Sequence, residues 1–383
     1  MTFTALLLGA YGHVGRQAIS GLSRMNCIDT IIASGRNKDK LESIISGMVP
    51  DGYREKITTK SFDAFDSTIL QDACKGVDLV INCMGPFTND QGRVAAIVIT
   101  NGTNYIDIAN EQSQYRSLLK LDEEAKQKDV VLITGAGTSP GISTLLFMLG
   151  ASKLQDPVVS MDMFYASGRH PTENEAFGST MGALLEASIG SKALKDGNLV
   201  NVALGKKYRT TVMPGPFGKV KMVEFPTADA LIMQAAFHDA ALKNVGAFWA
   251  MGDIPFGLST LLKLLKPHKR KWANDFFAGI VRSTMAAEFK KLQEQGIGTE
   301  AVMKVIVAGL NDDDTWEATL TFPRGGGEAA HYIPLIYAGM IATGQFEKRG
   351  LVTPADGDIE PMMLQKYMNE HGWTGTFTES GGQ

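Results

Sequence analysis

Three glycines near the start of the chain have the spacing of a phosphate-binding turn. Gly9, Gly12 and Gly15 follow an apolar run at residues 3–8 and precede a helical pattern. Missing Cβ atoms would permit a tight turn, bring a pyrophosphate close to the backbone and let the helix pack on the strand. The backbone amides and the dipole at the start of the helix would hold the phosphates. The alternative is an ordinary strand-to-helix turn, which the glycine spacing alone would also fit. The candidate residues are Gly9, Tyr11, Gly12, His13, Val14 and Gly15.

The second apolar run, at residues 31–33, ends in a polar tip that indicates which dinucleotide binds. NAD sites usually carry Asp or Glu here to bind two ribose hydroxyls. A guanidinium and a hydroxyl suit a 2′-phosphate, which a carboxylate would repel. We therefore expect NADP(H), the alternative being a solvated polar loop. The residues of this tip are Ser34, Arg36, Asn37 and Lys38.

The fourth apolar run, at residues 77–83, is followed by a sharp turn that should reach the nicotinamide half of the site. Phe87 could pack on the nicotinamide or the substrate, or it could be a core aromatic. Cys83 fits a small buried residue better than a reactive thiol. Asp63, after the third predicted strand, could touch the adenine. The candidate residues of this turn are Asn82, Cys83, Gly85, Pro86 and Phe87.

Two polar side chains at the end of the fifth predicted strand are candidates for catalysis. Tyr105 and Asp107 are two residues apart, so they share one face of the strand, and Glu111 lies nearby. Tyr105 or Asp107 could donate a proton or hold a substrate ammonium group. The alternative is that they stabilise the start of the next helix, where Asp is favoured. We expect no metal, because no His or Cys pair has ligand spacing.

The pattern of apolar segments predicts two domains. Strands alternate with helices through about residue 140, which is typical of an α/β fold with a Rossmann-type, doubly wound parallel sheet. Short strands grouped with helices then indicate a second α+β domain. We expect an NADP-binding domain at residues 1–140 and a substrate or dimerisation domain at 141–327. The C-terminal segment 328–383 is expected to return to the first domain.

Composition narrows the class of protein further. The chain has 383 residues, 44% of them hydrophobic, which is enough for two cores. A formal net charge of −4 gives no reason to expect nucleic acid. Three cysteines without metal spacing favour a reducing, cytoplasmic setting. Met1 leads directly into the first predicted strand, so we expect no signal peptide, and no apolar run has the length of a membrane span.

One stretch has an unusual combination of apolar and basic residues. Residues 247–265 are strongly apolar and predict a helix, and residues 266–271 are mostly basic. Such a helix could lie on an anionic membrane surface or line an apolar substrate entrance. The alternative is a buried helix or one in the interface of a homodimer, the oligomeric state that we expect.

Several short motifs are spread along the chain in a defined order. They lie at residues 9–15 (GAYGHVG), 34–36 (SGR), 80–87 (VINCMGPF), 102–107 (GTNYID) with Glu111, 139–141 (SPG), 194–200 (LKDGNLV) and 350–355 (GLVTPA). In this order they resemble the saccharopine dehydrogenase-like oxidoreductases, especially the branch with the trans-acting enoyl reductases. The resemblance implies a Rossmann domain, an α+β domain and a nicotinamide cofactor. It does not identify one substrate, since members of the family act on opines, lysine derivatives or lipid-like enoyl groups.

These features predict an NADPH-dependent reduction of a C=C or C=N bond in a small, apolar or lipid-like substrate. Short-chain dehydrogenases share the glycine spacing but need a Tyr with Lys four residues later, and none of the nine tyrosines has one. An opine-type dehydrogenase would need basic side chains to hold carboxylates, and Arg169, Arg209 and Lys219 form no compact cluster in the sequence. A non-catalytic NADP(H)-binding sensor is the other alternative.

Overall fold

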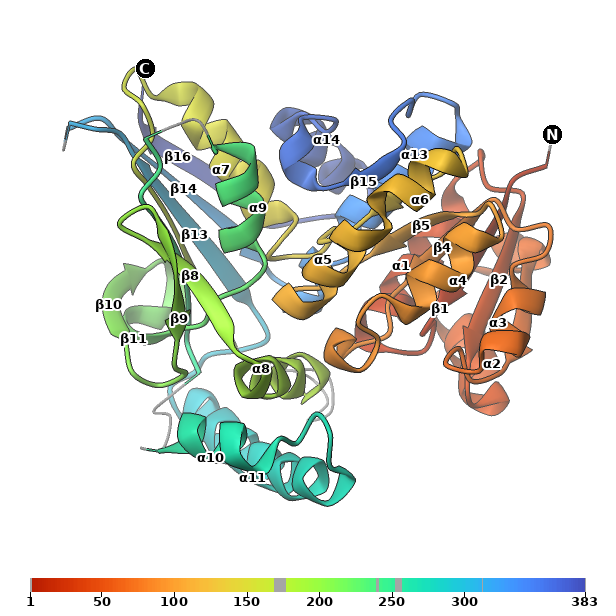
Figure 1. Cartoon of the computed structure of the whole chain (residues 1–383), viewed down its shortest axis with the longest axis horizontal. Coiled ribbons are helices and arrows are strands. Elements are labelled where there is room, and N and C mark those ends of the chain that lie inside the picture. The colour runs from red at the N-terminus through yellow and green to blue at the C-terminus, as the bar shows by residue number, and fades with distance from the viewer. Residues whose placement is uncertain (1, 169–176, 239–240, 252–256, 312, 383) are drawn as a thin grey trace. The chain divides into compact units, whose positions relative to one another are not determined.

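The computed structural model of the chain describes residues 2–168, 177–238, 241–251, 257–311 and 313–382 (Figure 1). They form two compact units, each assembled from several stretches of chain. The C-terminal segment is divided between these units at residue 371. The first unit contains Met1–Ala109, Ser113–Gly141 and Gly327–His371, and the second contains Asn110–Gln112, Ile142–Gly326 and Gly372–Gln383.

A seven-stranded sheet forms the centre of the first unit, and every pair of neighbouring strands is parallel. The strand order β3-β2-β1-β4-β5-β6-β15 reverses direction between β1 and β4. In open α/β sheets, this switch point is where ligands bind, outside the carboxyl ends of the strands. The predicted Rossmann-type fold is confirmed. The strands are β1 (Thr4–Leu8), β2 (Thr30–Gly35), β3 (Ile57–Ser61), β4 (Leu79–Asn82), β5 (Asn104–Asp107), β6 (Val131–Ile133) and β15 (Gly350–Val352).

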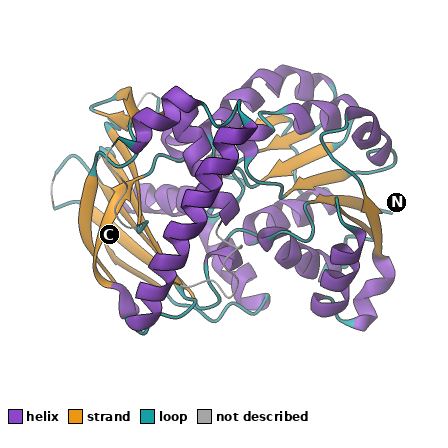
Figure 2. Ribbon diagram, turned by 90° about the horizontal axis from the view of Figure 1, so that it is seen from below, coloured by secondary structure: helices purple, strands orange, loops and turns teal. Residues whose placement is uncertain are grey.

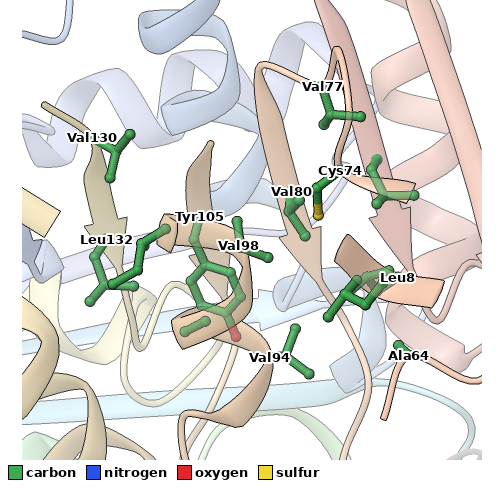
Figure 3. Packing of buried hydrophobic residues seen from close by; sticks show 14 of the residues in the cluster. Leu8, Ala64, Cys74, Val77, Val80, Val94, Val98, Tyr105, Val130 and Leu132 are labelled. Atoms are coloured by element: carbon green, nitrogen blue, oxygen red, sulfur yellow. The ribbon is translucent and has the colours of Figure 1, made fainter. Parts of the chain in front are cut away.

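Helices cover both faces of this sheet, so its central strands are apolar on both sides. On one face, Leu8, Val80 and Tyr105 pack with Val94 and Val98 of α4 in a closed core (Figure 3). The helices of this face are α3 (Ser67–Ala73), α4 (Arg93–Thr100), α5 (Gln112–Leu118) and α6 (Asp122–Gln127).

The other helices of the first unit pack tightly against one another. A Cβ built at Gly21 of α1 would lie 2.3 Å from Cδ1 of Leu335 in α13, so glycine leaves room for the Leu335 side chain between these helices. The α13 helix also packs on α14. The helices of this group are α1 (His13–Arg24), α2 (Lys38–Met48), α13 (Tyr332–Ala342) and α14 (Pro361–Glu370).

The second unit contains a nine-stranded mixed sheet (Figure 2). Its central pair, β12 and β7, is parallel, and the pairs farther out are antiparallel. The last strand, β16, pairs with β14 at one edge. The strands are β7 (Ser160–Ser167), β8 (Ser191–Lys195), β9 (Asn198–Val202), β10 (Tyr208–Met213), β11 (Gly218–Glu224), β12 (Asn244–Trp249), β13 (Ala301–Ala308), β14 (Thr315–Phe322) and β16 (Phe377–Gly381).

Long and short helices complete the second unit. The α7 helix packs on β13 and β14, and α8 packs against α10 and α11. Among the described residues, no helix is both long and apolar enough to cross a membrane. The helices are α7 (Ile142–Lys153), α8 (Phe177–Ile189), α9 (Asp229–Ala236), α10 (Leu258–Leu265) and α11 (Lys271–Glu294), and α12 (Gly326–Ala329) lies where the chain leaves the unit.

The prediction of one helix across residues 247–265 is wrong. Residues 247–249 belong to β12, and a helix begins only at Leu258. Parallel pairing with β7 explains the difference, because Phe248 lies opposite Phe164 and the two rings stack with centroids 5.3 Å apart. This long-range pairing outweighs the helical pattern of the local sequence. Residues 252–256 lie outside the described residues.

Glycine at position 150 allows α7 to approach the sheet of the second unit. A Cβ there would lie 2.5 Å from Cε3 of Trp316 and 2.6 Å from Cγ2 of Val307. We expect Gly150→Ala to lower the free energy of unfolding by about 1–3 kcal/mol through overpacking. The control is Gly279→Ala in α11, where a Cβ has open space and alanine should stabilise the helix by up to about 1 kcal/mol. Equal effects of both changes in denaturant titrations would contradict this account.

Candidate cofactor and active site

The turn between β1 and α1 has the geometry of a phosphate cradle. Gly9 has a φ of +77°, and a Cβ at Gly15 would lie 2.1 Å from the Gly9 carbonyl oxygen. Gly12 is the N-cap of α1, and no side chain caps this helix end. The first amides of α1 therefore keep donors for an anion, and the bare backbone leaves space for it. These residues fit the pyrophosphate of a dinucleotide.

Two ring side chains frame this cradle. The Tyr11 ring occupies the space that a Cβ of Gly35 would need, and its hydroxyl accepts a hydrogen bond from the Arg36 amide at 3.3 Å. Tyr11 thereby fixes the tip of β2 next to the glycine turn. The His13 ring packs on the backbone of Gly327, and its Nδ1 lies 2.9 Å from the guanidinium of Arg16. Val14 is half-buried in the first turn of α1.

Of the residues predicted to bind the 2′-phosphate at the tip of β2, some are exposed to solvent and others are already used in the fold. Arg36 and Lys38 are exposed, as a 2′-phosphate partner must be. Asn37 caps α2, because its side chain accepts the Lys40 amide at 2.9 Å. Ser34 is buried, and its hydroxyl donates to the carbonyl of Leu7 at 3.1 Å. This geometry favours Arg36 and Lys38 for the phosphate and gives Ser34 a structural hydrogen bond.

Asp63 lies directly beyond the strand that pairs with the β2 tip. The Phe62 amide donates to the Gly35 carbonyl, which brings residue 63 to the same edge of the sheet as Arg36. Asp63 is exposed, and its carboxylate accepts the Phe65 amide at 3.0 Å. This placement suits contact with an adenine, a role that stays a prediction.

The turn after β4 lies at the switch point beside Gly9. The Cys83 amide donates to the Leu8 carbonyl, and the Asn82 side chain accepts the Met84 amide at 3.0 Å. The Gly85–Pro86 peptide follows, and Phe87 is buried. Burial raises the pKa of the Cys83 thiol to about 12, which favours a packed, uncharged side chain over a reactive thiol. Asn82 holds this turn in place.

Asp107 is the centre of a buried polar cluster at the end of β5. One carboxylate oxygen accepts the Thr134 hydroxyl at 2.8 Å and the Ala109 amide at 3.1 Å. The other accepts the Gln114 amide group at 3.0 Å and the Tyr105 hydroxyl at 3.2 Å. Burial raises the pKa of Asp107, while these donors stabilise its charged form.

Tyr105 connects this cluster to the turn after β4. Its hydroxyl receives a hydrogen bond from the side chain of Asn82 at 2.9 Å. Tyr105 and Asp107 therefore lie together, as expected from their spacing, and both are fully buried. The burial favours a role in positioning Asn82 and the turn after it. Direct proton donation to a substrate by either residue stays a prediction.

The cluster includes residues that the sequence patterns did not single out. Asp90 accepts the Asn82 side chain at 3.2 Å and the Val94 amide at 2.9 Å. Gln114 also accepts the Gly92 amide at 2.8 Å. Asp90 precedes an apolar helix at a position typical of a helix start, and this local signal could have identified it. Among the described residues, no group of three or more His, Cys, Asp or Glu side chains could hold a metal.

The parallel sheet, the glycine turn at its switch point and the basic tip of β2 define a Rossmann-type dinucleotide-binding protein. Residues 5–133 match the family model described as the saccharopine dehydrogenase NADP binding domain. This stretch, about a third of the chain, is accordingly an NADP-binding domain of the saccharopine dehydrogenase type. The predicted resemblance to this family and the predicted cofactor are thus confirmed, while the narrower resemblance to trans-acting enoyl reductases stays a prediction.

Similar proteins agree with this classification. Saccharopine dehydrogenase-like oxidoreductases of Rattus norvegicus and Mus musculus are 26% and 30% identical over 147 residues, 35% of this chain. The match covers only 34% of the length of each of these two relatives. A saccharopine dehydrogenase (L-Glu forming) from Saccharomyces cerevisiae has a TM-score of 0.62, covering 99% of this chain and 100% of that chain at 15% identity. This likeness shows a shared fold.

The exposed guanidinium of Arg36 gives a direct test of the cofactor site. We expect Arg36→Asp to weaken NADPH binding about 10- to 100-fold, because a charge-assisted contact is replaced by repulsion. NADH binding should change much less in the same fluorescence titrations. Lys128→Asp is a control with the same charge change, placed where α6 ends before β6. An unaltered ratio of the two affinities in Arg36→Asp would exclude Arg36 from the phosphate site.

The buried carboxyl of Asp90 predicts a specific pH dependence of stability. Burial raises its pKa from 3.8 to about 6. The folded state thus keeps a proton that the unfolded state loses between about pH 4 and pH 6, so the free energy of unfolding falls as pH rises through this window. Between pH 4 and pH 7, the free energy of unfolding of the wild type should fall by about 2 kcal/mol more than that of Asp90→Asn.

Denaturant titrations across this pH range measure the difference. Glu55→Gln, which changes an exposed carboxylate, serves as the control and should follow the wild type. Parallel pH profiles for Asp90→Asn and the wild type would show that Asp90 does not titrate in this window.

Proposed function

We propose that the protein is an NADPH-dependent oxidoreductase that reduces a C=C or C=N bond in a small, apolar or lipid-like molecule. The observation that carries this proposal is the uncapped glycine turn beside a tip with Arg36 and Lys38 and no carboxylate. NADPH, when bound, supplies the hydride. The residues of this chain would hold its phosphates and fix the orientation of its rings.

The buried polar cluster around Asp107 would position the turn after β4. Asp107 fixes Tyr105, Tyr105 fixes Asn82, and Asn82 accepts the Met84 amide in the turn expected to face the nicotinamide. An error of about 1 Å in such a turn is enough to reduce hydride transfer strongly. We therefore propose that Tyr105 and Asp107 act as positioning residues for this turn.

The second unit supports an apolar substrate over a dicarboxylate. Arg209 is paired with Asp162 and stacks on the Phe248 ring at 4.7 Å, and Glu224 pairs with Lys195 at 2.8 Å. A carboxylate on the substrate would have to compete with these partners. Lys219 is exposed, and Arg169 lies outside the described residues. The opine-type alternative therefore has weaker support.

Oxidation of NADPH with a panel of acceptors tests the proposal. The panel contains enones and enoyl thioesters of increasing chain length, cyclic imines, and 2-oxo acids paired with amino acids. We expect activity with an enoyl or imine acceptor, rising with its apolar length, and reduced activity in Arg36→Asp at low NADPH. Activity only with a 2-oxo acid and an amine would establish the opine reaction. Tight NADPH binding without oxidation across the panel would favour a sensor.

A further inference from the structure

The helices α10 and α11 lie next to each other in the second unit (Figure 1), and both carry large apolar side chains that are exposed to solvent. Leu264 is 69% exposed, Trp272 59% and Phe276 52%. On α11, the residues Trp272, Phe276 and Ile280 are four apart and thus form one stripe along the helix. On α10, the exposed Leu261 and Leu264 are three apart and share a face in the same way. We call residues 258–280 the apolar–basic segment.

The exposed stripes belong to helices that are fixed in the second unit. Leu262 of α10, and Phe277 and Val281 of α11, are buried in a core cluster with residues of α8 and β11. Each helix therefore has one face packed on its own unit and a second apolar face in solvent. A core alone requires only the first of these faces, so the second indicates a partner.

The charges around these stripes indicate the chemistry of the partner. Between residues 257 and 283 the sequence has six Lys or Arg and a single acidic residue, Asp275, in a chain with a net charge of −4. Lys266, Lys269 and Arg270 are exposed in the link between the helices, directly before Trp272. Aromatic and basic side chains next to an apolar stripe are typical of segments that lie in the headgroup region of a membrane.

We propose that the apolar–basic segment docks on a membrane surface that carries anionic lipids. The apolar side chains would enter the headgroup boundary, and the basic link would bind lipid phosphates. A second copy of the chain fits less well, because it would bring two basic links together. The predicted segment 247–271 is thereby redefined, since Phe248 is fully buried in β12 and the exposed stripe continues to Ile280.

Vesicle binding gives the first test, and it does not depend on the proposed reaction. The full chain should float with vesicles of phosphatidylglycerol and phosphatidylcholine, far less with phosphatidylcholine alone, and progressively less as salt increases. Trp316 and Trp373 are buried and Trp249 is half-buried, so a blue shift of tryptophan emission on binding should come from Trp272. Trp272→Tyr should remove that shift.

Two double variants separate the apolar and the electrostatic contributions. The apolar double variant is Trp272→Ser with Phe276→Ser, and the basic double variant is Lys269→Glu with Arg270→Glu. We expect each of them to weaken vesicle binding about 10-fold or more. The control is Met362→Ser with Met363→Ser, a second exposed apolar pair on α14, which should bind as the wild type does. NADPH affinity and thermal unfolding should remain unchanged in all three.

The results that would overturn the membrane proposal can be distinguished from a failure of the proposed reaction. Equal vesicle binding by the wild type and both variants of the segment would overturn the proposal. So would a dimer in sedimentation velocity that dissociates in Trp272→Ser with Phe276→Ser, because the segment would then be an interface between copies. NADPH binding measured in the same preparations shows whether the first unit is intact.

Discussion

The buried carboxylate of Asp107 holds together the carboxyl edge of the first sheet. A carboxylate without solvent is costly unless donors surround it, and here the donors come from β5, the loop after it, α5 and the loop after β6. Each of these segments must therefore take its position for the charge to be satisfied. The turn after β4 depends on the same charge through Tyr105 and Asn82.

A second constraint is the contact between Gly15 and the Gly9 carbonyl. It sets how closely α1 approaches β1, and hence where the first amides of the helix point. Tyr11 extends this constraint to the next strand by its contacts with Gly35 and the Arg36 amide. Tyr11 thus joins the phosphate cradle to the basic tip of β2.

Local contacts were predictable from the sequence, and long-range ones were not. The apolar runs and the glycine spacing predict the parallel sheet and its turn, because each pattern consists of residues that are close together in the sequence. The inward direction of Ser34 depends on the Leu7 carbonyl, and the strand at Phe248 depends on pairing with Phe164. Likewise, the Thr134 hydroxyl reaches Asp107, 27 residues away in the sequence, through the pairing of β5 with β6.

The order of the strands also has a consequence for synthesis of the protein. The edge strand β15 of the first sheet starts at Gly350, and the edge strand β16 of the second starts at Phe377. Neither sheet is therefore complete until these two strands have left the ribosome. The edges of β6 and β14 stay unpaired until then, as open strands that invite pairing with other chains. A nascent chain that lacks β15 and β16 thus exposes one open strand edge in each of its two sheets.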